Sequence, residues 1–488
     1  MENKSIKYNF FMNFILTVSS ILFPLITFPY VSRVLLVEGN GIVAFSASIT
    51  TYFSMFASLG IPTYGIRACA KVRDDKSKLS TVVQELFIIN IITTFIVSIA
   101  FVLSIYLVPK FNLQKELFLI NGITLILNAL GVNWLYSALE QYKYITIRSL
   151  IFKIISILLM FLFVKNTNDY VIYGAILVFA SAGSNILNFI NLRKFVSFKK
   201  TEKYDFSQHI KPILIFFGTS AAISVYTNLD VAMLGFIKSD IEVGYYNVGI
   251  KVKTVFISLV TSLGTVLLPR LSYYIENNKI QEFKKMIVKA INFVLVVSTP
   301  IVLYFVVYAK QSVLLLSGPA YMGSIIPMQF LMPTVLLIGL SNITGIQVLV
   351  PLNKEKELLI SIIFGAVIDF VLNLYFINLW GASGAAASTL IAELVVLLVQ
   401  CIYLRKYLHQ VLGQISFIKI AFANIISLAV ISPFRYAVTF SKGIFIELLL
   451  TATIFFLSYG IVLVLTKETF VVENILPFIK KRKDKLFK

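Results

Sequence analysis

Charged side chains within long apolar stretches are the residues of this chain best able to do chemistry. A charge at membrane depth is costly, so it usually faces a water-filled cavity or a partner of opposite charge. Three such acids, Asp230, Asp369 and Glu393, could bind Na⁺ or a proton. We therefore predict them as ion-coupling residues, with no other cofactor implied.

Basic side chains in similar positions could bind an anion. Arg and Lys form strong charge-assisted hydrogen bonds to phosphate, which favours a phosphate or pyrophosphate ligand at Arg33, Arg67, Lys251 and Arg270. The alternatives are that Lys251 snorkels to the headgroups and that Arg67 and Arg270 are topology anchors. Asp230 and Lys251 are expected at similar depth on consecutive helices, so they could also form an ion pair.

Side-chain amides and a tyrosine add groups suited to a hydroxyl-rich ligand. Asn185 and Asn228 are predicted to bind it, and Asn188 shares a helix face with Asn185. The alternative interpretation is hydrogen bonding between helices. The full set is Asn128, Asn133, Asn185, Asn188, Tyr226, Asn228, Asn342 and Asn373.

Several kinds of catalytic and metal site are excluded by the motifs. No Gly-Lys pair occurs, so the phosphate loop of ATPases is absent. His209 and His409 are both expected in loops, and Cys69 and Cys401 lack metal-binding spacing. We therefore predict no metal site and no enzymatic activity.

Fourteen apolar stretches position these side chains. The chain of 488 residues is 58% hydrophobic, with a mean hydropathy of +0.88, which excludes a soluble core. A bilayer core of about 30 Å requires roughly 20 apolar residues, and lipid favours helices. We predict an all-α polytopic membrane protein with 14 transmembrane helices, at residues 11–32, 43–61, 84–108, 117–138, 146–164, 170–192, 212–236, 247–269, 287–309, 324–350, 358–378, 381–404, 415–434 and 443–466.

The net charge of +20 follows topology. With a cytoplasmic N-terminus, 31 of the 43 Lys and Arg residues lie in inner segments, eight in outer segments and four within helices. This is the positive-inside rule. We therefore expect a plasma-membrane protein with both termini cytoplasmic, and no nucleic-acid partner.

A weak internal repeat divides the chain. Gly41 precedes Arg67 by 26 residues, and Gly244 precedes Arg270 by the same number. The offset covers six predicted helices, so both copies share one orientation, which implies a pseudo-twofold axis along the membrane normal. The predicted divisions are an N-lobe at 1–200 (helices 1–6), a C-lobe at 201–410 (helices 7–12), and helices 13 and 14 with a basic cytoplasmic tail at 411–488.

Six stretches carry a family resemblance through their order and spacing. They are Pro29–Leu35 with Gly41, Leu59–Lys71, Asn228–Gly235, Val243–Lys251, Leu268–Arg270, and Asn373 with Trp380–Ala385. Over essentially its whole length the chain resembles the polysaccharide transporter family, the Wzx-type oligosaccharide flippases of the MATE-like exporter superfamily. It departs from the family pattern near Val37, where a glycine is usual.

The resemblance implies a V-shaped pair of lobes and alternating access. The implied cargo is an undecaprenyl-pyrophosphate-linked oligosaccharide, or a teichoic acid repeat unit, moved to the outer leaflet by an ion gradient or the membrane potential. Helices 13 and 14 would hold the lipid tail, in what is expected to be a monomer. Pathway partners would be a polymerase and glycosyltransferases. The positions carried over for headgroup binding or gating are Arg33, Arg67, Asp230, Lys251 and Arg270.

Two other functions are weighed against this one. A drug or cation antiporter of related fold would need an acidic, apolar cavity, which the intramembrane cations disfavour. A membrane enzyme of polymer assembly would need a large outer loop or a cluster of acids and histidines, and the sequence offers neither.

Overall fold

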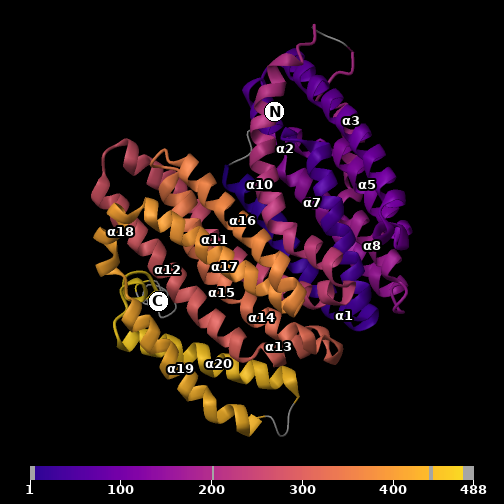
Figure 1. Cartoon of the computed structure of the whole chain (residues 1–488). Coiled ribbons are helices and arrows are strands. Elements are labelled where there is room, and N and C mark those ends of the chain that lie inside the picture. Colours follow the sequence, from indigo (N-terminus) through magenta and orange to yellow (C-terminus); the bar gives the residue numbers. More distant parts are fainter. Residues whose placement is uncertain (1–5, 200–202, 439–442, 476, 478–488) are drawn as a thin grey trace, which may run out of the picture. The chain divides into compact units, whose positions relative to one another are not determined.

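Helices make up almost all the regular structure of the chain (Figure 1). The computed structural model describes residues 6–199, 203–438, 443–475 and 477, and among these there is no β-strand. Most of the predicted basic C-terminal tail lies outside the described residues. The chain separates into two compact units, Met1–Gly244 and Tyr245–Lys488, which are described one at a time below.

The described residues contain 12 helices long and apolar enough to cross a membrane. A thirteenth span follows if Arg405–Gln414 and Phe417–Pro433, which are bent by 57°, are one crossing. The predicted class of polytopic, all-α membrane protein is thereby confirmed. One candidate, Phe11–Lys71, is 61 residues long and contains the first two predicted spans.

In the first unit the long helix α1 packs against α3, α5, α7 and α10. Its helices are α1 (Ile6–Ser58), α2 (Ile61–Lys71), α3 (Lys76–Leu107), α4 (Pro109–Leu113), α5 (Lys115–Gly131), α6 (Asn133–Ala138), α7 (Tyr142–Phe163), α8 (Tyr170–Val178), the π-helix η1 (Phe179–Gly183), α9 (Asn185–Leu192) and α10 (Ser207–Ile237). Helix α11 (Asp240–Glu276) begins in this unit and continues into the second.

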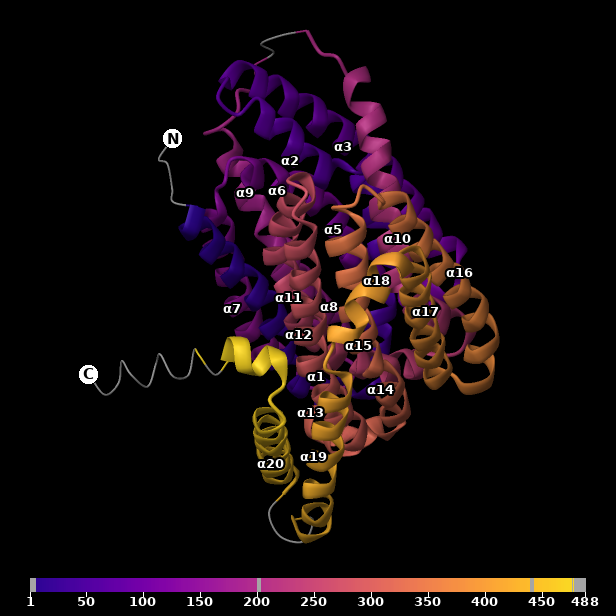
Figure 2. The same ribbon diagram turned by 90° about the vertical axis from the view of Figure 1, so that its left-hand side faces the viewer.

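In the second unit α16 packs along α17, and α19 packs along α20 (Figure 2). Tyr304 of α12 and Tyr308, the residue after this helix, form an apolar cluster with Ile431 of α19 and Phe455 of α20. The elements are α12 (Ile280–Val307), α13 (Ala309–Ser317), η2 (Pro319–Ser324), α14 (Ile325–Leu331), α15 (Pro333–Asn342), η3 (Ile343–Leu349), α16 (Glu355–Trp380), α17 (Ala382–Tyr403), α18 (Arg405–Val411), η4 (Leu412–Gln414), α19 (Phe417–Val438), α20 (Ile444–Leu465) and η5 (Val471–Ile475).

Several helices begin earlier than the sequence predicted. Helix α7 starts at Tyr142 instead of residue 146, and α10 starts at Ser207 instead of residue 212. His209, which was expected in a loop, therefore lies within α10 and is buried, and Arg148, which was counted with the inner segments, is buried within α7. The expectation was wrong because polar first turns do not register as part of an apolar span.

The two glycines of the predicted repeat contact each other's helices. An added Cβ at Gly41 would overlap the carbonyl oxygen of Asp240, and one at Gly244 would overlap that of Val37. Each glycine thus lies against the residue four positions before the other, and all four residues belong to the first unit. Such reciprocal contact is what a local twofold axis gives. A break in α1 at Leu36, with φ 56° and ψ −168°, precedes this crossing.

Candidate functional site

A polar cavity of about 870 Å³ lies inside the first unit. Serine, threonine and asparagine side chains supply most of its polar wall, together with the two cations Arg148 and Lys153. No Asp or Glu is among its described lining residues. The cavity is therefore basic as well as polar, which suits a ligand that carries negative charge and many hydroxyl groups.

Arg148 is the most unusual residue of this cavity. It lies on α7, is only 5% exposed, and its Nη2 donates a hydrogen bond to Asn133 Oδ1 at 3.1 Å. Its Nε and Nη1 are buried and have no hydrogen-bond partner among the described residues. Leaving a buried charged donor unsatisfied costs several kcal/mol. Arg148 thus has two free donor groups at a polar cavity, as an anion site requires.

A chain of amides holds Arg148 in place. Asn133 Oδ1 also accepts from Asn188 Nδ2 at 2.9 Å, and Asn133 Nδ2 donates to Asn185 Oδ1 at 3.0 Å. Asn185 Nδ2 in turn donates to Asn128 Oδ1 at 3.1 Å. Three helices, α5, α6 and α9, are joined through these bonds. The amides therefore orient the guanidinium and join helices, as the alternative interpretation of the sequence held. Ligand binding by these amides stays a prediction.

A break between α5 and α6 allows the four asparagines to form these hydrogen bonds. Val132 adopts φ 36° and ψ 39°, a left-handed conformation that is costly for a β-branched residue. The break places Asn133 at the start of α6, facing α7 and α9. At the preceding position, an added Cβ on Gly131 would lie 2.5 Å from the Asn185 side chain, so glycine is needed there.

The second cation of the cavity, Lys153, lies farther along α7. Its Nζ donates to Ser19 Oγ at 3.0 Å and to Ser20 Oγ at 2.8 Å, both on α1. Neither partner is charged, so no described ion pair neutralises the lysine. Together Arg148 and Lys153 supply two cations from one helix.

The structure places one of the nine predicted site residues, Asn185, in this cavity. Arg33, Arg67 and Arg270 are exposed, and Asn228 and Lys251 are half-buried. The acids Asp230, Asp369 and Glu393 are buried, the last two on the packed helices α16 and α17. Asp230 and Lys251 belong to different units, so their ion pair stays a prediction. The roles of all nine residues likewise stay predictions.

Sequence reasoning missed Arg148 because the residue was counted with the cations of the inner segments, although the predicted span at 146–164 includes it. The sequence did offer one signal for Arg148: a second cation, Lys153, lies five residues farther along the same apolar helix. The intramembrane amides, by contrast, were found, and Asn128, Asn133, Asn185 and Asn188 form one hydrogen-bonded chain that reaches the arginine through Asn133.

Comparison with known proteins identifies the class first. Over 91% of the chain the fold is similar to a lipid II flippase, MurJ, in an inward closed conformation, with TM-score 0.65, 18% identity and 98% of that chain covered. It is also similar to an inward-facing multidrug resistance MATE transporter of the MOP superfamily, with TM-score 0.63, 14% identity, and 80% and 95% of the two chains covered. The fold is thus similar to the folds of these MATE-like proteins.

The family follows from the sequence. The family described as polysaccharide biosynthesis protein matches residues 6–275, and the chain belongs to it. A candidate O-antigen transporter of Escherichia coli (strain K12) is 27% identical over 394 residues, covering 80% of this chain and 94% of the relative. The predicted family resemblance is therefore confirmed. These relatives are transporters, in agreement with the prediction that the chain is not an enzyme.

Proposed function

We propose that this protein is a flippase that moves a lipid-linked oligosaccharide from the inner to the outer leaflet of the plasma membrane. The observation that carries the proposal is the cavity of the first unit, where the buried Arg148 has two free donors and no described acid opposes it. The relatives named as an O-antigen transporter and a lipid II flippase support the same class of cargo.

The chemistry of the cavity matches the polar part of such a lipid. Moving sugars and phosphates unaided through hydrocarbon is prohibitive, because each polar group would lose its hydrogen bonds to water. In the cavity, hydroxyl and amide side chains replace water around the sugar, while Arg148 and Lys153 bind the pyrophosphate. The isoprenoid tail needs no such site, because it stays in lipid.

The proposal includes a topology of 14 helices with both termini cytoplasmic. A helical segment of 61 residues, as in Phe11–Lys71, is about 90 Å long, far more than one crossing of a core of about 30 Å. We count it as two spans on either side of Leu36 and count the bent pair at Arg405–Pro433 as one. Two lobes that alternate in access to the two faces of the membrane would then move the headgroup.

The proposal also covers the energy source of transport and the kind of oligosaccharide that is moved. Asp230, Asp369 and Glu393 are the candidate residues for Na⁺ or proton coupling, and a membrane potential could act on the charged headgroup directly. The oligosaccharide would serve a surface polymer such as O-antigen, capsule or teichoic acid. The glycosyltransferases and polymerase of that pathway would then be functional partners.

Purified protein in proteoliposomes tests this function. We expect undecaprenyl-pyrophosphate-linked oligosaccharide placed in one leaflet to become accessible in the other, measured with a glycosidase or lectin that cannot cross the membrane. A cationic dye should not be expelled under the same ion gradients. Expulsion of the dye without movement of the lipid would contradict the proposal and favour the antiporter.

Replacing Lys153 by Gln is expected to slow translocation moderately. The lysine is half-buried and bonded to two serines, so its loss should cost one charge-assisted hydrogen bond to the ligand, roughly a tenfold drop in rate. The matched control is Lys165→Gln, an exposed lysine just beyond the end of the same helix. Equal rates for K153Q and K165Q would remove Lys153 from the site.

A further inference from the structure

A second polar pocket, of about 560 Å³, lies in the second unit, where the ends of several helices meet. It is lined by the end of α11, the first turns of α12, η4 and the segment that follows α20. Lys285 and Lys289 of α12 bring positive charge to it, and Glu282 of α12 and Glu473 of η5 bring negative charge. We call it the α12 pocket. Its described charged residues therefore offer both signs of charge in equal number.

The four charged side chains of the α12 pocket are exposed, and among the described residues no ion pair joins any two of them. Lys285 and Lys289 lie four positions apart on one face of α12, an arrangement of like charges that destabilises a helix. A ligand phosphate between the two lysines would remove this repulsion. To satisfy Glu282 and Glu473 as well, the same ligand would need a positive group.

Buried hydrogen bonds hold one wall of the α12 pocket in place. Asn292 of α12, which is 2% exposed, accepts from the backbone N–H of Ser416 at 3.1 Å and donates to Thr469 Oγ1 at 3.4 Å. The hydroxyls of Ser416 and Thr469 lie 3.0 Å apart. Glu468, which is fully buried, accepts from the backbone N–H of Val471, the first residue of η5, at 2.9 Å. The segment after α20 is therefore fixed against the start of α12.

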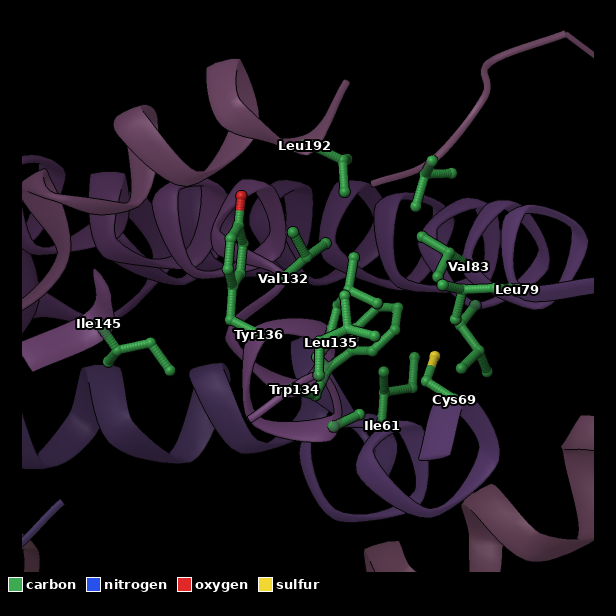
Figure 3. Close-up of a cluster of buried hydrophobic side chains, with 14 of the residues drawn as sticks. Ile61, Cys69, Leu79, Val83, Val132, Trp134, Leu135, Tyr136, Ile145 and Leu192 are labelled. Atoms are coloured by element: carbon green, nitrogen blue, oxygen red, sulfur yellow. The ribbon is translucent and has the colours of Figure 1, made fainter. Parts of the chain in front are cut away.

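The predicted repeat shows what occupies the corresponding place in the first unit. Its matched arginines, Arg67 and Arg270, are 203 positions apart. At this offset the three charged residues of α12 correspond to apolar residues of α3, which are Leu79, Val82 and Leu86. These belong to or pack against one apolar cluster, part of which is shown in Figure 3 with Leu79 and Val83 together. The fold accepts apolar side chains at this place, so the charges of α12 need another explanation.

The α12 pocket lies at the level of lipid headgroups. Helix α20 is a candidate membrane span that ends at Leu465, and Thr469 of the pocket follows four residues later. Leu465 is 74% exposed, and Ile418, in the first turn of α19, is 85% exposed. Acyl chains thus have apolar surface next to the polar pocket. Basic pockets between the ends of transmembrane helices typically bind phospholipid headgroups, so the position favours a lipid over a soluble anion.

We propose that the α12 pocket binds the headgroup of a zwitterionic phospholipid with a phosphate and a primary ammonium, as in phosphatidylethanolamine. Lys285 and Lys289 bind the phosphate, and Glu282 and Glu473 accept hydrogen bonds from the ammonium. A phospholipid charged only at its phosphate would leave both carboxylates without a partner. The α12 pocket shares no described lining residue with the cavity of the first unit, so this site goes beyond the transport of the lipid-linked oligosaccharide.

Native mass spectrometry of the full-length protein in detergent tests this site. Phosphatidylethanolamine, phosphatidylglycerol and phosphatidylcholine with the same acyl chains would be titrated one at a time. We expect phosphatidylethanolamine to bind roughly tenfold more tightly than the other two, because phosphatidylglycerol has no ammonium and the choline group has no N–H to donate. Equal binding of all three lipids, or phosphatidylglycerol binding as tightly as phosphatidylethanolamine, would overturn the proposal.

Variants of the charged residues locate the lipid. Lys285→Gln and Lys289→Gln should each weaken phosphatidylethanolamine binding by roughly tenfold. The matched control is Lys284→Gln, which lies beside them on α12 but outside the pocket and should bind as the unaltered protein does. Glu473→Gln should weaken the binding of phosphatidylethanolamine and leave that of phosphatidylglycerol unchanged. Unchanged binding of phosphatidylethanolamine in both K285Q and K289Q would contradict the proposal. The assay involves no transport, so it and the flippase assay can fail independently.

Discussion

Replacing Arg148 by Gln is expected to lower the rate of lipid-linked oligosaccharide translocation by roughly a hundredfold or more. Two free donors of a buried guanidinium would make hydrogen bonds to the pyrophosphate, and each bond to a charged group is worth about 1.5–3 kcal/mol. Gln cannot supply the charge. The measurement is the initial rate in proteoliposomes at equal protein density.

The same substitution should leave the protein at least as stable. Arg148 has no described carboxylate partner, and removing an uncompensated buried charge is neutral or favourable for folding. The matched control is Lys143→Gln, an exposed lysine on the same helix, which should change neither rate nor melting temperature. Arg148→Lys should retain part of the rate. A lowered melting temperature with an unchanged rate in R148Q would show that the arginine is structural.

Replacing Gly41 by Ala is expected to destabilise the protein by about 1–3 kcal/mol or more. The added Cβ would overlap backbone atoms of Asp240. A helix backbone, unlike a flexible side chain, cannot move aside. Ordinarily Gly to Ala within a helix is stabilising by roughly 0.5–1 kcal/mol. The sign of the change in stability therefore shows whether the two helices cross at Gly41. The measurement is thermal unfolding in detergent.

Two further variants control for this crossing. Gly218→Ala on α10 has open space around the added Cβ and should be neutral or stabilising. Gly244→Ala should be as harmful as G41A. Because both glycines share one contact, the double variant should lose less stability than the two losses added together. Stabilisation in G41A, or full additivity in the double variant, would show that the helices do not meet there.

The sequence predicted the class of fold because lipid imposes a simple pattern of apolar spans. What it did not predict are the departures from regular helix. Leu36 and Val132 both adopt positive φ, which their side chains disfavour and which only the surrounding contacts impose. Helix starts were also placed late, as at Lys76 of α3, where the Asp75 side chain caps a polar first turn that belongs to the helix.

Part of the site was predicted because polar side chains stand out within the apolar spans that lipid imposes. The amides around Asn185 lie within apolar spans. Polar side chains are costly in lipid, so the sequence marks these amides as candidate site residues. Arg148 lies near a span end, where an arginine normally anchors topology, and only the tertiary structure shows it buried against Asn133. The pairing of Glu85 with His209 joins residues 124 positions apart and follows from no local pattern.

The most direct test of the account is a structure of this protein bound to its undecaprenyl-pyrophosphate-linked oligosaccharide, determined by electron cryomicroscopy. We expect a phosphate oxygen within hydrogen-bond distance of Arg148 Nε or Nη1, with sugar density against the amides of Asn128, Asn133 and Asn185. A pyrophosphate bound away from Arg148 and Lys153, with the cavity of the first unit filled by water alone, would contradict the proposed site.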